Sequence, residues 1–166
     1  MEKIAIIIRG PAGVGKSSLS QILHEKIFNS AHIDIDLLKR MMSHDSSDTR
    51  TSVAHTVTLF FIGELAAKGY NIIVEEIFKE IHLIPTKELL EKLGYRVLIV
   101  FLTAPLPQLI ERDHCREIKE KGVGVISRLH KEIRPGKEDI IIDTAENSLD
   151  KSVESILAYL AHLDGE

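Results

Sequence analysis

The chain has 166 residues, one cysteine and a formal net charge of −4; 44% of its residues are hydrophobic and 28% are charged. That length and balance predict a single domain over residues 1–166 and exclude disordered, collagen-like and disulfide-knotted chains. The apolar runs fall far short of the roughly 20 residues of a membrane-spanning helix, so we expect no membrane partner. The first run ends at Arg9, too early for an export leader, and the lone Cys115 forms no internal disulfide; both favour a cytoplasmic protein.

Short apolar runs alternate with longer stretches of helical spacing along the whole chain. Because most runs are apolar on successive residues, they predict strands that are buried on both faces. The expected fold is α/β, a three-layer, doubly wound, five-stranded parallel sheet with a helical lid. The strands are predicted at Lys3 to Ile8, Ala31 to Ile35, Asn71 to Glu75, Arg96 to Leu102 and Glu138 to Asp143. The helices are predicted at Lys16 to Phe28, Leu37 to Met42, Thr51 to Lys68, Ile84 to Leu93, Leu106 to Lys121, Gly124 to Glu132 and Leu149 to Leu163.

A phosphate-loop motif directly follows the first predicted strand. It matches G-x-x-x-x-G-K-[ST] at every fixed position and reads Gly10, Pro11, Ala12, Gly13, Val14, Gly15, Lys16, Ser17. Glycines let such a loop curl so that main-chain N–H groups face phosphate oxygens, and the next helix presents its positive end. We expect this loop and Ser18 to bind a nucleotide, with Lys16 at the β- and γ-phosphates and the Ser17 hydroxyl on Mg²⁺. The rival dinucleotide fingerprint fits poorly, since starting it at Gly13 puts Ser18 at its third glycine.

Further segments in the expected order point to one class of nucleotide-binding protein. The chain lacks the Asn-Lys-x-Asp motif of GTPases, which leaves small kinases. From the phosphate loop and residues 33–40, 72–78, 111–116 and 141–144, the chain resembles P-loop small-molecule kinases such as chloramphenicol phosphotransferase and adenylylsulfate kinase. The resemblance implies a P-loop kinase fold, ATP and Mg²⁺ as cofactors, and transfer of the γ-phosphoryl group to a hydroxyl of a small-molecule acceptor.

Acidic and basic residues follow the second predicted strand, at the sheet edge where doubly wound folds bind ligands. In the kinases that the chain resembles, the matching Asp meets the acceptor hydroxyl, which implies Asp36 as the catalytic carboxylate. The alternative is that Asp36 caps a helix predicted from Leu37. Asp34 points to the same side of an extended chain and is expected to support substrate or Mg²⁺. The resemblance implies that Lys39 and Arg40 meet an anionic group of the substrate, although a solvated helix face explains them equally well.

Two glutamates and one histidine complete the expected acceptor side. Glu75 ends the third predicted strand where the resembled kinases often carry an Asp that holds the water shell of Mg²⁺, so we expect Glu75 to reach the metal through water. Glu76 follows and is expected to bind substrate or to take the metal role instead. His55 lies in the helix predicted to flank the acceptor pocket, where a substrate contact and a structural role are both open.

The segment 112–137 is the predicted lid, with eight Lys or Arg residues against four Asp or Glu. Arg112 and Arg116 are four residues apart and therefore share one helix face. The resemblance implies that they close over ATP and neutralise charge on the transferring group, with Arg128 as a third candidate. Surface salt bridges are the alternative for these arginines.

Two rival functions stay open. The first is a kinase for polynucleotide 5′-hydroxyls, against which stand the net negative charge and the absence of Trp. The second is a regulator that binds a nucleotide without consuming it. The sequence leaves the acceptor and the oligomeric state undetermined, and residues 43–60 and 77–90 are expected to select the acceptor.

Overall fold

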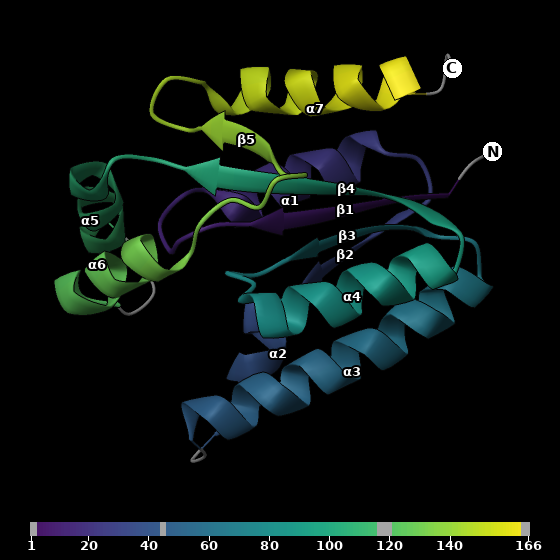
Figure 1. The fold of residues 1–166 in the computed structure, drawn as a ribbon, viewed down its shortest axis with the longest axis horizontal. Coiled ribbons are helices and arrows are strands. Elements are labelled where there is room, and N and C mark those ends of the chain that lie inside the picture. The colour runs from purple at the N-terminus through teal and green to yellow at the C-terminus, as the bar shows by residue number, and fades with distance from the viewer. Residues whose placement is uncertain (1–2, 44–45, 116–120, 164–166) are drawn as a thin grey trace.

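The computed structural model describes residues 3–43, 46–115 and 121–163 (Figure 1). Within them, parallel strands form one five-stranded sheet in the order β2-β3-β1-β4-β5. The strands are β1 (Lys3–Arg9), β2 (Ser30–Asp34), β3 (Asn71–Glu75), β4 (Tyr95–Thr103) and β5 (Ile140–Asp143). The predicted α/β fold with a five-stranded parallel sheet is therefore confirmed.

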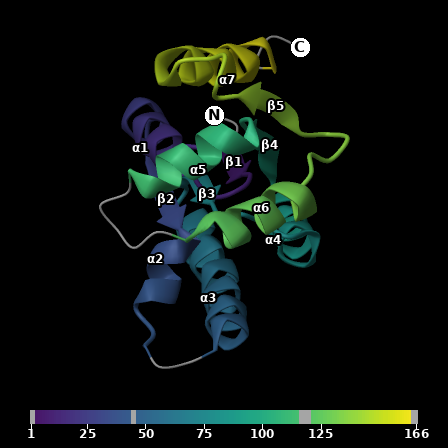
Figure 2. The same ribbon diagram turned by 90° about the vertical axis from the view of Figure 1, so that its left-hand side faces the viewer.

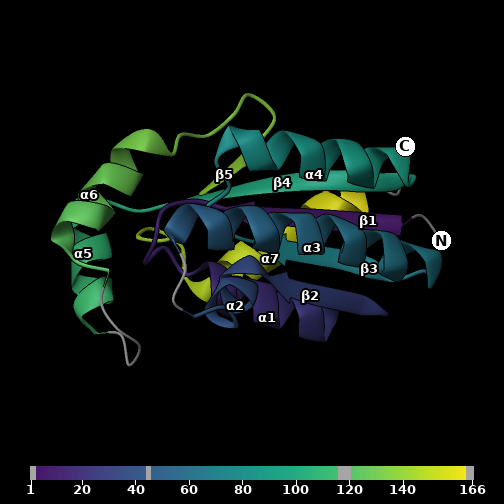
Figure 3. The same cartoon turned by 90° about the horizontal axis from the view of Figure 1, so that it is seen from below.

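Helices cover both faces of this sheet. On one face lie α1 (Lys16–Lys26) and α7 (Leu149–Leu163), and on the other lie α3 (Ser47–Ala67) and α4 (Glu80–Lys92) (Figures 1 and 3). Among the described residues, no helix is both long and apolar enough to cross a membrane.

The central strand β1 shows why the apolar runs of the sequence do not alternate with polar residues. Ile6 and Ile8 pack into the core beneath α1 and α7, while Ala5 and Ile7 pack into the core beneath α3 and α4. All four side chains are fully buried. Burying each isoleucine side chain contributes about 1.5–3 kcal/mol, so both layers of helices are held to the sheet by the same strand.

Three short helices gather at the carboxyl-terminal edge of the sheet. The helix α2 (Ile35–Arg40) follows β2 directly, and α5 (Leu106–His114) and α6 (Val123–Glu132) pack against each other across the strand ends (Figure 2). The phosphate loop also leaves β1 at this edge. The fold therefore brings the phosphate loop, α2 and the described parts of α5 and α6 to one end of the sheet.

The predicted helix from Leu106 to Lys121 is wrong in its length. The helix α5 ends at His114, and residues 116–120 lie outside the described part of the chain. The buried Asp113 carboxylate accepts hydrogen bonds from the main-chain N–H groups of Lys121 and Gly122, both at 2.9 Å. These bonds hold the start of α6 against the end of α5, so the two helices are separate.

Two other helices begin earlier than predicted. The side chain of Ser46 accepts a hydrogen bond from Thr49 N at 3.1 Å and so caps α3, which starts at Ser47 and not at Thr51. The helix α4 starts at Glu80 and carries Pro85 inside it, whereas the prediction placed the helix start next to this proline.

Candidate active site

The phosphate loop is shaped by glycines that no other residue can replace without strain. Gly10 has φ 141°, and a Cβ there would overlap the main-chain carbonyl of Leu102 on β4. Gly15 is the N-cap of α1 with φ 95°, and no described side chain caps the helix. The first amides of α1 are therefore left for an anion, as in nucleotide-binding loops.

Lys16 lies over the inside of this loop. Its Nζ donates hydrogen bonds to the carbonyl oxygens of Gly10 and Pro11, each at 3.0 Å. Burial lowers the pKa of Lys16 to about 8, although the surrounding carboxylates oppose that shift. Because burial disfavours the charged form of Lys16, an anionic group bound in the loop would stabilise its ammonium group.

Ser17 and Glu75 meet where the phosphate loop faces the end of β3. Ser17 Oγ donates a hydrogen bond to Glu75 Oε2 at 3.0 Å, and His32 Nε2 lies 2.9 Å from Glu75 Oε1. The Glu75 side chain is only 2% exposed, so both contacts fix its carboxylate in one orientation. His32 was missed by sequence reasoning, although it lies two residues before Asp34 on the same strand and therefore on the same face of the sheet.

The donor set at Ser17 and Glu75 fits Mg²⁺. The described residues contain no group of three or more His, Cys, Asp or Glu side chains that could hold a metal ion. Mg²⁺ does not require one, because at nucleotide sites it is bound by one or two protein oxygens together with phosphates and water. A serine hydroxyl and a buried carboxylate in contact at the phosphate loop supply such oxygens.

Asp34, not Asp36, caps α2. Asp34 Oδ1 accepts a hydrogen bond from Leu37 N at 3.2 Å, and its Oδ2 lies 3.6 Å from Arg40 NH2. The alternative role of Asp36 as a helix cap is therefore excluded, since the helix begins at Ile35 and Asp36 belongs to its first turn. For the same reason Asp34 and Asp36 do not lie on one extended chain, yet both line the same cavity.

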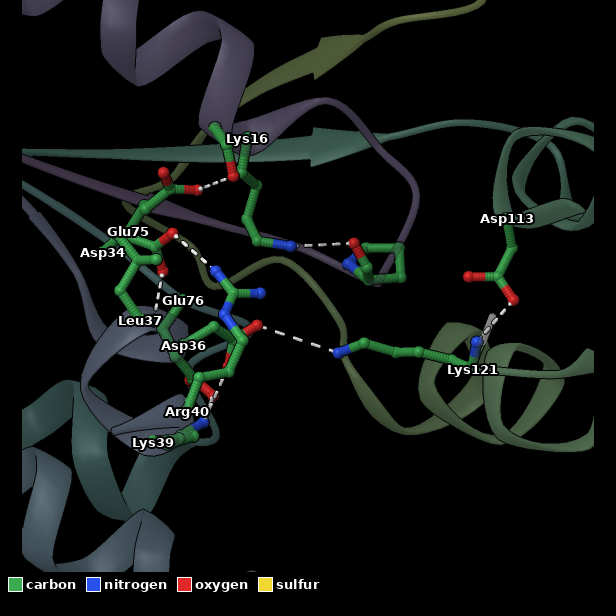
Figure 4. A network of polar contacts seen from close by, with 12 residues as sticks. Lys16, Asp34, Asp36, Leu37, Lys39, Arg40, Glu75, Glu76, Asp113 and Lys121 are labelled. Atoms are coloured by element: carbon green, nitrogen blue, oxygen red, sulfur yellow. Dashed lines mark hydrogen bonds and ion pairs between the residues drawn. The ribbon is translucent and has the colours of Figure 1, made fainter. Parts of the chain in front are cut away.

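Asp36 faces two lysines from different elements (Figure 4). Lys39 Nζ, one turn later on α2, lies 3.1 Å from Asp36 Oδ1, and Lys121 Nζ, just before α6, lies 3.8 Å from Asp36 Oδ2. Burial raises the pKa of Asp36, but Lys121, Lys39 and the more distant Lys16 outweigh it, so the pKa falls below its usual value. The carboxylate is therefore ionised at neutral pH. Sequence reasoning missed Lys121.

Glu76 lines the same cavities as Asp36 and is held by two groups. Lys39 Nζ donates to Glu76 Oε1 at 2.5 Å, and Phe78 N donates to Glu76 Oε2. Burial raises the pKa of Glu76, but the charge and hydrogen bond of Lys39 outweigh this effect and lower it. Phe78 has φ 51°, an uncommon conformation for a bulky residue, and this turn directs the chain from β3 into the acceptor side.

His55 on α3 is buried behind Glu76. Its ring stacks on His82 of α4 with centroids 3.8 Å apart, and its Nε2 is 3.9 Å from Glu76 Oε2. Neither ring nitrogen of His55 has a hydrogen-bond partner among the described residues. Burial lowers the pKa of His55 to about 4, so the ring is neutral at pH 7. His55 lines a side pocket of about 140 Å³ that adjoins the acceptor side through Ser52 and His82.

The predicted lid arginines lie in different places. Arg112 NH1 and NH2 donate to Thr144 Oγ1 and Thr144 O, both at 2.9 Å, which ties α5 to the loop after β5. Arg116 lies outside the described residues. Arg128 on α6 is exposed and its Nε is 3.9 Å from Glu132 Oε1.

Three adjoining cavities run along this edge of the sheet. The first, about 370 Å³, lies between the phosphate loop and the start of α7, and the second, about 510 Å³, lies over the loop. They share Gly13, Gly15, Ser18 and Arg112. The third, about 940 Å³, lies between α2, α3 and α6. It shares with the second cavity Asp36, Arg40, Glu76 and Lys121.

Most of the residues predicted for the site come together in this chain of cavities. The middle cavity is lined by Ala12, Gly13, Gly15, Lys16, Ser17, Ser18, Asp34, Asp36, Arg40, Glu75, Glu76, Arg112 and Lys121. Pro11 contributes its carbonyl to Lys16, while Val14 is fully buried beneath the loop. Lys39 lines the outer cavity.

Comparisons with known proteins agree with this geometry. The family model described as Zeta toxin matches residues 1–122 of the chain. A search of curated protein sequences gave no match.

Several solved structures share the fold. The tunicamycin resistance protein of Deinococcus radiodurans is 22% identical, with a TM-score of 0.73 over 96% of this chain and 96% of that chain. A gluconokinase from Sinorhizobium meliloti 1021 is 21% identical, with a TM-score of 0.73 over 96% and 93% of the two chains. The APS kinase CysC of Mycobacterium tuberculosis, in complex with AMPPNP and APS, is 21% identical, with a TM-score of 0.73 over 96% and 98%.

Proposed function

Because the chain belongs to the zeta toxin family of P-loop kinases, we propose that it transfers the γ-phosphoryl group of ATP to a hydroxyl of a small-molecule acceptor. One observation carries the proposal. The phosphate loop and the Asp36 carboxylate line one cavity, which opens on one side to a nucleoside-sized pocket and on the other to a larger cavity for an acceptor. The neighbours named as a gluconokinase and an APS kinase, the latter bound to AMPPNP, support ATP and a small acceptor.

On the nucleotide side, the loop amides and Lys16 bind the phosphates. Ser17 would hold Mg²⁺ directly, and Glu75 would reach it through water. The metal, when bound, neutralises charge on the phosphate oxygens. Arg112 lines both the nucleoside pocket and the phosphate cavity, and Thr144 orients its guanidinium there. Arg116 stays a proposed second arginine of the lid.

On the acceptor side, Asp36 receives the hydroxyl. Its lowered pKa makes it a weak base, so it orients the hydroxyl and takes the proton late, as a loose phosphoryl-transfer transition state allows. Lys39 and Lys121 hold the carboxylate in place, and Lys121 connects it to the α5–α6 unit. We further propose that the chain is a single cytoplasmic domain in which the α5–α6 unit is the lid.

The test is an acceptor-dependent assay of ADP release on Asp36→Asn. Turnover should fall by about 10²–10⁴-fold, because the amide cannot accept the proton. The affinity for Mg²⁺ and ATP, measured by calorimetry, should stay close to that of the parent protein. Glu64→Gln, on the exposed surface near the far end of α3, makes the same change of charge away from the three cavities and should leave turnover unchanged.

The outcomes separate the rival functions. Full turnover by Asp36→Asn contradicts the role of this carboxylate. Tight nucleotide binding by the parent protein without any acceptor-dependent turnover indicates a regulator that does not consume ATP.

A polynucleotide 5′-hydroxyl is the second acceptor class, because Lys and Arg side chains outnumber carboxylates in the outer cavity. Transfer of labelled phosphate to oligonucleotides alone, with none to a panel of small metabolites, would support it.

A further inference from the structure

The outer cavity is more basic than the rest of the chain, whose net charge is −4. Six cationic side chains line it, against three carboxylates. The cations are Lys39, Arg40, Arg50, Lys79, Lys121 and Arg128, and the carboxylates are Asp36, Asp48 and Glu76. The excess positive charge of three lies where the proposed acceptor binds.

The three cations nearest the phosphate loop are already engaged. Lys39 pairs with both Asp36 and Glu76, Lys121 pairs with Asp36, and Arg40 pairs with Asp34. The sequence-based expectation placed an anionic group of the substrate at Lys39 and Arg40. The observed ion pairs neutralise these two side chains with carboxylates of the protein.

Arg50 differs from all of them. It lies in the first turns of α3 and lines the outer cavity, and its Nε is buried without a hydrogen-bond partner among the described residues. No described carboxylate forms an ion pair with it. Among the described residues, no hydrogen bond or ion pair uses the rest of the Arg50 guanidinium, so its terminal donors are left for an oxygen ligand in the cavity.

Two further cations across the cavity are only weakly engaged. Lys79 and Arg128 share one carboxylate, Glu132, at 3.8 and 3.9 Å, and their side chains are 61% and 64% exposed. Exposed ion pairs at such distances contribute little to stability. An anionic ligand can therefore take the place of Glu132 beside these two cations at small cost in free energy.

We infer, on the premise of the proposed kinase function, that the acceptor carries a phosphate or a similar oxyanion, which Arg50 binds with help from Lys79 and Arg128 while the reacting hydroxyl lies at Asp36. A guanidinium matches the paired oxygens of a phosphate or carboxylate. The excess of cations over carboxylates in the cavity lining favours an anionic group on the acceptor. The cavity of about 940 Å³ has room for a phosphorylated sugar or a nucleotide beside the transferring group.

The first experiment measures binding without turnover. The parent protein, loaded with Mg²⁺ and a non-hydrolysable ATP analogue so that the phosphate loop is filled, is titrated with inorganic phosphate while its thermal unfolding is followed. Phosphate should raise the unfolding midpoint in a saturable way. Arg50→Gln should remove the rise, and Arg50→Lys, which keeps the charge but not the paired donors, should keep part of it.

Lys68→Gln is the matched control for these variants. Lys68 is an exposed residue at the opposite end of the same helix, and its replacement removes the same charge. The phosphate response of this variant should equal that of the parent protein. Arg128→Gln should weaken the response less than Arg50→Gln does, because Arg128 is exposed.

The second experiment compares a panel of sugars with their phosphate esters as acceptors. The ester of a productive pair should be the better acceptor, and Arg50→Gln should lower kcat/KM for it about tenfold to hundredfold through the KM of the acceptor. The KM of ATP and turnover with the neutral sugar should not change.

The outcomes divide clearly. Equal use of sugars and esters, or a phosphate response that Arg50→Gln leaves intact, overturns the oxyanion site. An Arg50-dependent phosphate response without transfer to any acceptor supports the site and contradicts the kinase function. Transfer confined to oligonucleotides overturns the small acceptor proposed here.

Discussion

The two sides of the cleft are built in different ways. On the nucleotide side, the groups that face the ligand belong to one short segment, and they are main-chain amides, glycines and a single lysine whose ammonium rests on two carbonyls. On the acceptor side, they are charged side chains that come from α2, α3, the segment between β3 and α4, and the region of α6. They reach the same cavity only because the strands are ordered β2-β3-β1-β4-β5.

This difference between main-chain and side-chain binding groups determines how each side of the cleft responds to substitution. A main-chain cradle binds the same phosphates whatever the neighbouring side chains are, and it tolerates few substitutions because its shape depends on positive φ angles. A cavity made of side chains can change its ligand by single substitutions. We therefore expect variants on the nucleotide side to lose all activity and variants on the acceptor side to alter selectivity and orientation.

Lys16→Met should have the largest effect and tests the nucleotide side. It removes the ammonium at the phosphates, so kcat/KM should fall about 10³-fold or more. The free energy of unfolding, measured in urea, should hold or rise, because burial opposes the charge of this lysine. The exposed Lys92 at the end of α4 gives a matched control, Lys92→Met, with unchanged kinetics. A loss of less than tenfold would place the phosphates elsewhere.

Gly10→Ala tests whether backbone shape governs the nucleotide side. Its Cβ would overlap the carbonyl of Leu102, so the free energy of unfolding should fall by about 3 kcal/mol. Gly124→Ala in α6 has open space around the new methyl group and should be neutral or stabilising by up to about 1 kcal/mol. If both variants unfold in urea like the parent protein, the close approach of the loop to β4 is not required.

His55 provides a test of the acceptor side by pH. Its pKa falls from about 6.5 in the unfolded chain to about 4 in the fold, so the unfolded chain binds the proton first as the pH drops. Stability should therefore be lost between about pH 6.5 and pH 4, by roughly 2 kcal/mol after allowance for screening by water.

The measurement is the free energy of unfolding at several pH values for the parent protein and for His55→Leu. The stability of His55→Leu relative to the parent protein should rise as the pH falls, because leucine has no proton to gain. A difference that stays constant from pH 7 to pH 4 would mean that His55 is not held in its neutral form.

His32 lies between the two sides and should show the smallest effect. His32→Phe removes the contact with Glu75 Oε1, so the affinity of the ADP-loaded protein for Mg²⁺, measured by calorimetry, should fall about tenfold. His32→Gln keeps a donor and should restore most of it. Equal Mg²⁺ affinity in all three proteins would show that Ser17 alone orients Glu75.

The sequence predicted the sheet and the nucleotide side well for one physical reason. Both are encoded by contiguous residues: continuous apolar runs mark strands that are buried on two faces, and the phosphate loop is one segment with glycines at fixed positions. The start of α3 was missed because it depends on a local cap at Ser46.

The acceptor side was less predictable because it depends on contacts between distant segments. The approach of Lys121 to Asp36 requires the turn that Asp113 holds between α5 and α6, and no local pattern encodes that turn. The ion pair between Lys39 and Glu76 forms because β2 and β3 are neighbours in the sheet. The candidate residues are visible in the sequence as polar side chains, whereas their partners emerge only from the fold.

The most direct test of phosphoryl transfer across this cleft follows the phosphoryl group itself. The protein is given Mg²⁺, a metabolite extract and ATP that carries heavy oxygen in its γ-phosphoryl group, and the products are identified by mass spectrometry. If the protein transfers the phosphoryl group as proposed, one metabolite should gain one labelled phosphoryl group. The Asp36→Asn variant should not form this product. Label found only in inorganic phosphate, or the same labelled product from Asp36→Asn, would contradict the proposed transfer.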